Sequence, residues 1–496
     1  MNKENWNSVA IDCGNSSIRV VVGEYDGEKL RTTLVRQMGH KEIQINGCWF
    51  WDILAIFNCI KEGLREAYAR VGHIHSAGIS TWGIDYGLLG EGELLLANPL
   101  CHRNSFGEEG LSALTAEERR ELFDQTGIHC DKINTVFQIL GYRRRFPVFW
   151  RNAKALLLIP DLLNYFLTGE KNTDTSIVST SQLFDVTAGN YAAGIFKRFD
   201  IDPDLLPPLC PHGKVRGTLR PELVAELGIN SFPVVSVPGH DTAAAVAAIP
   251  TDSGEKPLFI SSGTWSLIGV ELPKPMVNAK VFQLGLTNEA GALGTTTLLK
   301  NSVGLFIAQR LRQEFGGVSE EYSPGGKTAI EDWNSIVAGI KSVGRPTGII
   351  DPNDPVFFNP PSMREAISTY LRRSGQRQPA REIDYFRVVY DSLALSYRAV
   401  VESLTDLGIA TGDLHIIGGG CQNHLLNQIT ADLTGRRVVV GPVEATSLGV
   451  LAMELLHPGI ASDLAAVRKV AATAGTREVY ESRGRWDNPV IPEAGG

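Results

Sequence analysis

Short apolar runs alternate with amphipathic stretches along most of the chain. The apolar runs are bounded by turn residues and predict buried strands at 8–14, 19–25, 75–81, 234–237, 257–263, 267–272, 413–420 and 436–441. Apolar residues recur with helical spacing at 54–71, 390–408 and 447–457, which predicts helices there. This alternation predicts an α/β fold whose sheets are covered by helices, and it excludes all-α and all-β folds.

Two of the predicted strand pairs resemble each other, VAIDCGNSSIRVVVGEY near the start and PLFISSGTWSLIGVEL near the middle. Each consists of an apolar strand, a small polar turn around Gly14 or Gly263, and a second apolar strand. Glycine permits unusual backbone angles, and hydroxyls beside exposed amides hold phosphate oxygens. Taken singly, each segment also fits an ordinary hairpin, because Gly, Ser and Asn are common turn residues.

The repeat predicts duplicated α/β domains that face each other across a cleft, which is a preferred place for ligands. The polar stretch 250–257 is rich in turn formers and follows Ile249. We therefore expect an N-terminal domain over 1–249 and a C-terminal domain over 250–496.

Asp241 lies between an apolar run, Pro233 to Val237, and an alanine-rich helix start, Thr242 to Ile249. Asp is a favoured N-cap residue because its oxygens accept hydrogen bonds from the free amides of the first turn. Taken alone, the residue is therefore best explained as a helix cap. A catalytic role needs support from the rest of the chain.

A third glycine cluster, Gly418 to Gly420, follows an apolar strand and precedes a helical segment at 421–435. Bare backbone at this point lets a flat ring or a phosphate come close, with helix amides directed at an anion. A plain strand-to-helix turn needs fewer glycines than this. The cluster therefore indicates a nucleotide contact.

Composition and charge narrow the class of partner. Of the 496 residues, 43% are hydrophobic and 21% are charged, and the formal net charge is −8, so no positive field attracts nucleic acid or an anionic membrane. The seven cysteines form no Cys-x-x-Cys pair, and no apolar signal region is present, which predicts a reducing cytoplasmic location. Walker A, Gly-x-Gly-x-x-Gly, His-Glu-x-x-His and Gly-x-Ser-x-Gly patterns do not occur in a suitable context.

Segments in one order along nearly the whole chain resemble the FGGY carbohydrate kinases. They include IDCGNSS, STWGIDYGLL, INTVFQI, IPDLLNYFLTGE, GHDTAAAVAA, SSGTWSLIGVEL, TNEAGALGTTTLLKN and HIIGGGCQNHLLNQITADLTGRRVVVGPVEATSLG. The resemblance implies two actin-like (ribonuclease-H-like) domains that close on ATP and a sugar. The protein's partners would then be ATP and the sugar, and not nucleic acid or a membrane. The chain would be a monomer or a homodimer.

The resemblance also implies roles for individual residues. Asp241 matches the catalytic base, and Gly83, His240 and Asp241 match sugar-side positions. Asp12 matches a residue that holds Mg²⁺ through water. The nucleotide-binding positions of the family fall on Gly14, Asn15, Ser16, Ser17, Gly263, Thr264, Asn301, Gln309, Gly419 and Gly420.

These roles agree with the chemistry of phosphoryl transfer. A sugar hydroxyl is a poor nucleophile unless a carboxylate accepts its proton, and an unperturbed Asp, with a pKa of about 3.9, is ionised at neutral pH. Backbone amides around Gly14 and Gly263 would hold the phosphates, while Mg²⁺ bridges them. A helix N-terminus keeps a carboxylate anionic, so Asp241 would serve as cap and base together.

One segment that departs from the family pattern bears on the identity of the substrate. The match is strongest to the family members that phosphorylate the primary hydroxyl of L-rhamnulose, but those members usually carry Tyr-Arg-Asp-x-Arg where this chain has His102-Arg103-Asn104-Ser105-Phe106. Ile18 also stands where a glycine is common. Another ketose, a polyol or a related carbonyl compound stays open as the substrate. A catalytically silent nucleotide-binding sensor stays open as a second class, and a dehydrogenase is disfavoured.

Overall fold

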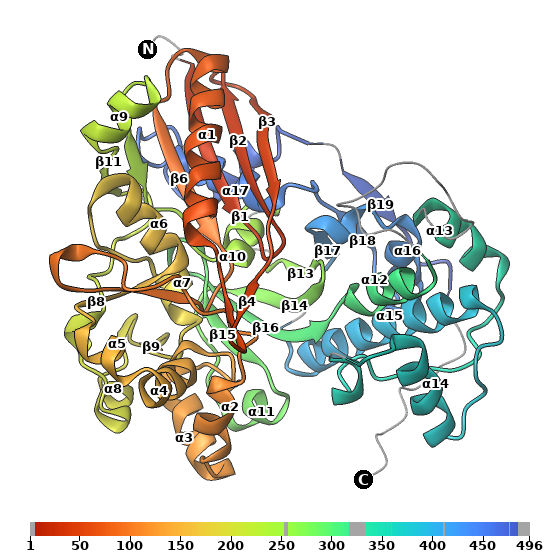
Figure 1. The fold of residues 1–496 in the computed structure, drawn as a ribbon. Helices are drawn as coiled ribbons and strands as arrows, with labels where there is room; N and C mark the ends of the chain where they lie inside the picture. The colour runs from red at the N-terminus through yellow and green to blue at the C-terminus, as the bar shows by residue number, and fades with distance from the viewer. Residues whose placement is uncertain are drawn as a thin grey trace. The chain divides into compact units, whose positions relative to one another are not determined.

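The computed structural model describes residues 5–251, 256–316, 333–358, 360–409, 412–475 and 477–484 (Figure 1). The chain folds into two compact units, each built from three segments that are not contiguous in the sequence. Unit 1 comprises Met1–Gly254, Glu271–Leu299 and Glu444–Gly475, and unit 2 comprises Glu255–Val270, Lys300–Val443 and Thr476–Gly496. The single boundary after Ile249 stays a prediction, and the stretch 250–257 lies partly outside the described residues.

The central sheet of unit 1 has six strands in the order β11-β12-β6-β1-β2-β3. Their bounds are Val215–Thr218 for β11, Pro233–Val235 for β12, Ser76–Thr81 for β6, Trp6–Cys13 for β1, Ser17–Tyr25 for β2 and Leu30–Gly39 for β3. β1 pairs antiparallel with β2, Cys13 opposite Ile18, and parallel with β6, Cys13 opposite Thr81. The first predicted hairpin is thus confirmed.

Helices cover both faces of this sheet. On one face, Val9 and Ile11 of β1 share a core with α1, α6 and α9, and on the other, Ala10 shares a core with α10, α17 and α18. The bounds are Ile53–Val71 for α1, Ile159–Thr168 for α6, Pro221–Leu227 for α9, Asp241–Ala247 for α10, Ala445–Glu454 for α17 and Leu464–Ala471 for α18. Alternate β1 side chains point to opposite faces, which explains why the successive residues Val9, Ala10 and Ile11 are all apolar.

Most of the remaining short helices and strand pairs, which the hydrophobic pattern did not predict, contribute to a second core of unit 1. The helices are α2 (Phe106–Ser112), α3 (Ala116–Thr126), α4 (Thr135–Arg145), α5 (Pro147–Asn152), α7 (Thr175–Ser179), α8 (Ala193–Phe199) and α11 (Ala279–Gln283). The paired strands are β4 (Ile43–Ile45) with β5 (Cys48–Phe50), β7 (Tyr86–Leu89) with β8 (Ala155–Leu158), β9 (Phe184–Asp185) with β10 (Asn190–Tyr191), and β15 (Thr287–Ala290) with β16 (Thr296–Val303).

The sheet of unit 2 contains the strands β14-β13-β17-β18-β19 in that order. Their bounds are Trp265–Leu272, Leu258–Ser262, Leu414–Ile417, Val438–Val440 and Glu478–Tyr480. β13 and β14 form the second predicted hairpin, with Ser262 opposite Ser266. β13 also runs parallel to β17, so the predicted strand before the glycine cluster lies beside the hairpin.

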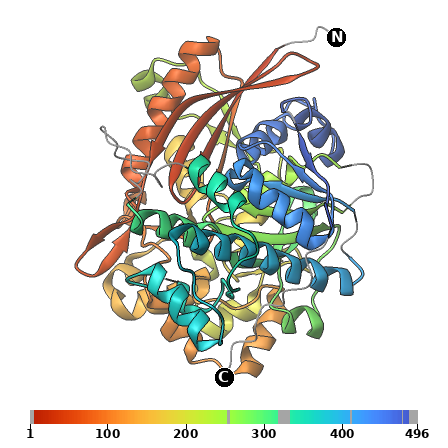
Figure 2. The ribbon, with the colours of Figure 1, turned by 90° about the vertical axis from the view of Figure 1, so that its right-hand side faces the viewer.

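The helices of unit 2 are α12 (Phe306–Glu314), α13 (Trp333–Ser342), α14 (Met363–Arg373), α15 (Glu382–Asp406) and α16 (His424–Thr434). The long helix α15 packs against α12, α13 and α16 (Figure 2). It begins eight residues before the predicted start at residue 390, because the Asp384 carboxylate accepts the Arg381 amide and pairs with its guanidinium. In the described part of the chain, every helix is too short or too polar to cross a membrane.

Candidate active site

Asp241 is the first residue of α10, and the cap position before it is His240, whose side chain makes no capping hydrogen bond. The Asp241 Oδ1 atom accepts a hydrogen bond from Thr242 Oγ1 over 3.2 Å, and the side chain remains 31% exposed. The cap interpretation is therefore incomplete, since the carboxylate lies inside the first turn and is accessible.

His240 links Asp241 to Glu289 of β15. Its Nε2 lies 3.5 Å from Asp241 Oδ1, and its Nδ1 lies 3.2 Å from Glu289 Oε2. Burial favours the neutral imidazole, but the Glu289 carboxylate and then Asp241 outweigh it and raise the pKa of His240 to about 9. At neutral pH an imidazolium therefore lies between two carboxylates.

The pKa of Asp241 departs from the sequence expectation. Partial burial raises it above its usual value, and the adjacent His240 cation opposes this rise by stabilising the ionised form. A carboxylate with a raised pKa is a better proton acceptor than an ordinary Asp while it stays ionised. His240 thus supplies the ionic stabilisation that we had expected from the helix start.

Asp12 lies at the end of β1 and is only 3% exposed. Ser447 Oγ donates to its Oδ2 over 2.9 Å, and near it Arg19 Nε lies 3.3 Å from Glu444 Oε2. Burial raises the pKa of Asp12 to about 7, and repulsion from Asp241 and Glu444 adds to the rise. Asp12 therefore offers a buried carboxylate oxygen, the kind of ligand that Mg²⁺ prefers, and Asp241 and Glu444 are near enough to repel its charge.

Close helix packing brings these groups together. A Cβ atom on Gly449 of α17 would lie 1.9 Å from the Ala244 carbonyl oxygen of α10, so the two helices approach through backbone. Thr446 Oγ1 lies 3.4 Å from the Asp241 carbonyl oxygen. The small residues of the alanine-rich segment thus allow the start of α17 to reach the start of α10.

The first phosphate-loop candidates, Gly14 to Ser17, form the tight turn between β1 and β2. The Gly14 amide donates to the Ser17 carbonyl over 2.9 Å, and His40 closes the turn with its amide on the Ser16 carbonyl over 3.0 Å. Asn15 Oδ1 is buried and has no hydrogen-bond partner among the described residues, which leaves the turn with an unsatisfied polar atom. Ile18 is fully buried in the core, so its bulk does not enter the turn.

Gly83 begins a strained turn after β6. Ile84 has a φ of 70°, which is rare for a β-branched residue. Thr180 Oγ1 accepts the Ile84 amide over 3.1 Å, and Thr135 Oγ1 donates to its carbonyl over 2.6 Å. Such strain is concentrated at functional sites, where surrounding contacts maintain it.

Asp85, two residues beyond Gly83, is fully buried and was not singled out from the sequence. Its Oδ2 lies 2.7 Å from Trp51 Nε1, 3.0 Å from Trp82 Nε1 and 2.8 Å from His102 Nδ1. Asp85, Cys101 and His102 also offer ligand atoms within 4.8 Å of one another. Burial holds the pKa of Cys101 well above its usual value, and N–H groups already occupy Asp85, so we assign no metal here.

The altered segment 102–106 serves mainly local structure. Asn104 bonds to both backbone groups of Trp49, at 3.0 and 2.8 Å, and Arg103 pairs with Glu42 over 2.8 Å. Ser105 and Phe106 begin α2. Of the three positions that depart from the family pattern, His102 contacts Asp85, whereas Asn104 bonds to Trp49 and Phe106 begins α2.

The candidates of unit 2 form a separate, uncharged set. The Gly263 amide donates to the Trp265 carbonyl over 2.8 Å, and the Thr264 carbonyl accepts the Gly304 amide over 3.1 Å. A Cβ on Gly420 would lie 2.0 Å from Ser262 Oγ, whereas one on Gly419 would meet nothing within 4 Å. The glycine cluster therefore packs directly against the end of β13, beside the Gly263 turn.

Asn301 and Gln309 lie on either side of this turn in the chain. Asn301 is exposed in β16, and Gln309 is half-buried in α12, whose first residue, Phe306, donates its amide to the Thr264 carbonyl over 3.3 Å. Between the glycines and α16 the chain forms a 3-10 turn over Gly419–Gln422, so helix α16 starts later than predicted. None of these unit 2 candidates has an ionisable side chain, whereas unit 1 holds Asp12, His240 and Asp241.

Two protein-family models match most of the chain. Residues 8–248 match the N-terminal domain, and residues 258–455 the C-terminal domain, of the FGGY family of carbohydrate kinases. The chain is 34% identical to a rhamnulokinase from Bacteroides thetaiotaomicron over 491 residues, 98% of either chain. It is 32% identical to a rhamnulokinase from Oceanobacillus iheyensis over 468 residues, 93% of this chain and 96% of the relative.

The fold is similar to that of a ligand-bound xylulose kinase from Lactobacillus acidophilus, with a TM-score of 0.77 at 15% identity, covering 96% of this chain and 94% of that one. The α/β class with two actin-like domains, expected from the sequence, is thereby confirmed. The chain therefore belongs to the FGGY family of carbohydrate kinases and is an ATP-dependent carbohydrate kinase.

Proposed function

We propose that the protein transfers the γ-phosphate of ATP to the primary hydroxyl of L-rhamnulose, giving L-rhamnulose 1-phosphate. The observation that carries the proposal is Asp241, an accessible carboxylate with a raised pKa at the start of α10, backed by the His240 and Glu289 pair. The names of the two curated relatives support the choice of sugar.

In this mechanism the substrate hydroxyl donates a hydrogen bond to Asp241. As the hydroxyl oxygen forms its bond to the γ-phosphorus, the bond from that phosphorus to the β–γ bridging oxygen breaks, and ADP leaves. The hydroxyl proton moves to the Asp241 carboxylate. His240 stabilises the ionised carboxylate before transfer, and Glu289 holds the imidazolium in place.

We assign the acceptor side to the N-terminal domain, 1–249, and most of the nucleotide side to the C-terminal domain, 250–496. The sugar would lie near Gly83, His240 and Asp241. Phosphates would be held by the turns around Gly14 and Gly263, and the nucleoside by Asn301, Gln309, Gly419 and Gly420. Asp12, with Glu444 near it, would hold Mg²⁺ through water, and the ion when bound would neutralise phosphate charge.

The direct test is a coupled assay of ADP release with ATP, Mg²⁺ and a panel of ketoses and polyols. The proposal expects the highest kcat/KM for L-rhamnulose, together with a 1-phosphate product identified by NMR. If L-rhamnulose turns over only at the background rate while another compound turns over clearly, the kinase assignment stands and the assignment of L-rhamnulose as substrate is wrong.

A second candidate is a different ketose, because His102 stands where the L-rhamnulose-phosphorylating members usually carry Tyr. His102 Nδ1 lies 2.8 Å from Asp85 Oδ2, which accepts hydrogen bonds in the buried Trp51 and Trp82 cluster two residues beyond Gly83. A change there alters the polar groups available near the proposed sugar site. The same panel distinguishes this candidate, which expects a higher kcat/KM with a ketose other than L-rhamnulose.

A further inference from the structure

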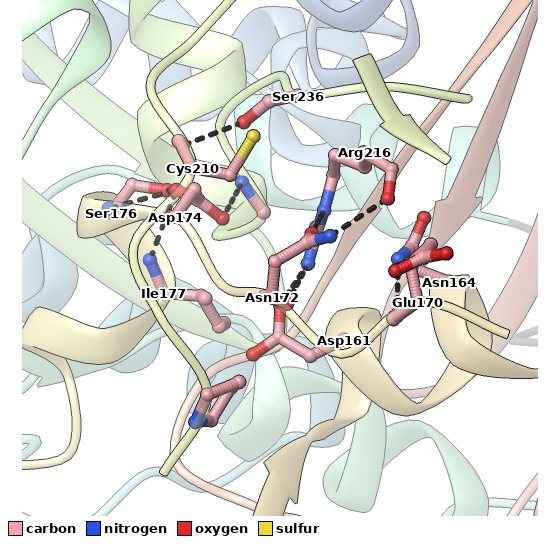
Figure 3. A network of polar contacts seen from close by, with 12 residues as sticks. Asp161, Asn164, Glu170, Asn172, Asp174, Ser176, Ile177, Cys210, Arg216 and Ser236 are labelled. Carbon is pink, nitrogen blue, oxygen red and sulfur yellow. Dashed lines mark hydrogen bonds and ion pairs between the residues drawn. The ribbon is translucent and has the colours of Figure 1, made fainter. Parts of the chain in front are cut away.

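Asp174 is a fully buried carboxylate that precedes the short helix α7. Its Oδ1 accepts from the Ser176 amide over 2.8 Å and from the Ser176 hydroxyl over 2.5 Å (Figure 3). It also accepts from His212 Nε2 over 3.2 Å. Its Oδ2 faces the other way and accepts the Gly239 amide over 3.0 Å. One side chain thus caps α7 and binds the turn that leads to Asp241.

The turn is held at two successive amides. Besides the direct bond from Gly239, the His240 amide donates over 3.2 Å to Ser176 Oγ, which itself donates to Asp174. A Cβ on Gly239 would lie 2.4 Å from Asp174 Oδ2, so the carboxylate touches bare backbone. Both amides therefore depend on Asp174, and both come immediately before Asp241.

The other end of α7 reaches the remaining parts of the site. Ser179 Oγ accepts the Ala290 amide over 2.9 Å, next to Glu289, and Thr180 Oγ1 accepts the Ile84 amide over 3.1 Å, next to Gly83. Helix α7 is therefore a shared support for the three segments that carry Gly83, His240 with Asp241, and Glu289. The Asp174 cap fixes one end of that support.

The neighbours of Asp174 require a carboxylate. His212 accepts the Leu293 amide at Nδ1 over 3.1 Å, so its Nε2 carries the hydrogen directed at Asp174, and the other partners are N–H and O–H donors. Burial raises the pKa of Asp174, but the bond from His212 and the nearby Arg216 cation outweigh this and lower it. An amide side chain would direct its own N–H groups at one of these donors.

Helix capping alone does not explain such a residue. Thr115 and Ser362 cap α3 and α14 with hydroxyl groups near the surface, whereas a fully buried charge carries a large desolvation cost. We propose that Asp174 is a positioning residue for the phosphoryl-transfer site, holding the 236–241 turn, and through it Asp241, at the position from which the carboxylate reaches the acceptor hydroxyl. The proposal rests on the proposed role of Asp241 as the base.

The first variant is Asp174→Asn. Its amide oxygen can keep the Oδ1 bonds that cap α7, while its NH₂ group faces the Gly239 N–H, so the turn loses its acceptor. We expect kcat to fall about 10- to 100-fold, the effect of a misplaced catalytic group, with the dissociation constant for ADP unchanged. Ser176→Ala removes the bond to the His240 amide and the hydroxyl bond to Asp174 but leaves the bond from Gly239 to Asp174, and it should lower kcat by about 3- to 10-fold.

Asp161→Asn is the matched control. Asp161 is 1% exposed in the same network, and Arg216 Nη2 lies 2.6 Å from its Oδ1 (Figure 3). Within the described residues, the Asp161 side chain bonds to Arg216 and not to the 236–241 turn. The control removes an equally buried charge, so it should lower thermal stability similarly and leave kcat within about twofold. An equal loss of kcat in the control overturns the proposal.

A double-variant cycle separates positioning from general damage. If Asp174 acts through Asp241, adding Asp174→Asn to Asp241→Asn should lower the residual kcat by less than about twofold. A merely structural role predicts that the two losses multiply. A full 10-fold or larger further loss in the double variant therefore contradicts the proposal.

Hydrogen exchange supplies a readout that needs no sugar. Exchange of the Gly239 and His240 amides, followed by NMR or mass spectrometry of the 236–241 segment, should accelerate about tenfold or more in Asp174→Asn and stay unchanged in Asp161→Asn. Unchanged exchange in Asp174→Asn overturns the positioning role. If wild-type protein phosphorylates no sugar, the proposed function fails, but the exchange result still decides whether Asp174 holds the turn.

Discussion

In both hairpin turns, a glycine amide donates to a carbonyl a few residues on: Gly14 to Ser17 over 2.9 Å in one, and Gly263 to Trp265 over 2.8 Å in the other. Their surroundings differ. The first turn follows Asp12, whose pKa is about 7 because of burial and repulsion from Asp241 and Glu444. The second turn is bordered by Ser262 and the Gly418 to Gly420 cluster, which carry no ionisable group.

The same supersecondary unit therefore serves two purposes, anion binding alone in one turn and anion binding beside ionisable groups in the other. A turn of bare amides binds anions through partial charges and needs no titratable group. Where a proton must be moved or a cation held, carboxylates are added around the same turn. We infer that the duplicated hairpin supplies phosphate binding in both units, and that acid–base chemistry was added in unit 1 alone.

The largest expected effect is on Asp241. Replacing the proposed base by an isosteric amide, Asp241→Asn, should lower kcat by about 10³-fold, within the range for general-base catalysis. The assay is steady-state turnover of L-rhamnulose at saturating ATP. Asp52→Asn, an exposed cap of α1 in the same unit, is the control and should retain full kcat. If Asp241→Asn retains the wild-type kcat, Asp241 is not the base and the proposed acid–base role of unit 1 is wrong.

The next effect concerns Glu289 and pH. The pKa of His240 is raised from 6.5 to about 9, so its contribution to stability is complete below pH 6.5 and is lost as the pH rises through 9. The free energy of unfolding of the wild type should fall across this window by on the order of 3 kcal/mol. In Glu289→Gln the fall should shrink, with the two proteins differing most near pH 6.5.

Chemical denaturation at several pH values measures this effect. Glu226→Gln is the control, because Glu226 forms an exposed pair with Lys61 over 2.7 Å and has no role in the site. The control should reproduce the wild-type profile. A Glu289→Gln profile parallel to that of the wild type would show that Glu289 does not set the charge on His240.

Two adjacent glycines beside the Gly263 turn, Gly419 and Gly420, test the uncharged set of unit 2. In Gly420→Ala the new Cβ would lie 2.0 Å from Ser262 Oγ, which must move, whereas in Gly419→Ala it would meet nothing within 4 Å. Overpacking of this kind costs about 1–3 kcal/mol, and we expect the Kd for ADP to rise roughly 10-fold in Gly420→Ala. Gly419→Ala should change stability little, so equal destabilisation of both variants would contradict the packing argument.

The smallest effect is expected at His102. Restoring the residue of the L-rhamnulose-phosphorylating members, His102→Tyr, should change the ratio of kcat/KM between L-rhamnulose and the next best ketose by about 3- to 10-fold, the scale of a single pocket contact. Arg103→Lys, whose side chain pairs with Glu42 nearer the surface, should leave the ratio unchanged. An unchanged ratio in His102→Tyr would place substrate selection elsewhere.

Local pattern predicted the strands of both hairpins, the start of α10, helices α1 and α17, and the α/β class. These features depend on neighbours in sequence: apolar alternation, turn residues and helical spacing. The length of α15 was underestimated because its first turns are stabilised by Arg381 and Asp384, not by an apolar stripe. The glycine candidates around Gly14 and Gly263 lie on turns of the kind that the sequence indicated, whereas Asn301 lies in a strand and Gln309 in a helix.

Residues whose role depends on distant partners were missed. Asp174 binds Gly239, 65 positions further on, and Glu289 faces His240 from another strand. Asp85 is surrounded by Trp51, Trp82 and His102, which no local pattern connects. Asp174 did leave a weak signal, since Asp-Thr-Ser before a short apolar run is typical of a capped helix. No sequence pattern of this kind indicated that each unit is built from three separate segments of the chain.

We infer that the chemistry is divided between an ionisable set in unit 1 and an uncharged set in unit 2, and calorimetric measurement of the ADP dissociation constant tests this division most directly. The titrations would compare the wild type, Asp241→Asn and Gly420→Ala. We predict that Asp241→Asn, despite its lost turnover, binds ADP within about twofold of the wild type, while Gly420→Ala binds roughly 10-fold more weakly. Weakened ADP binding in Asp241→Asn, with unchanged binding in Gly420→Ala, would contradict the division.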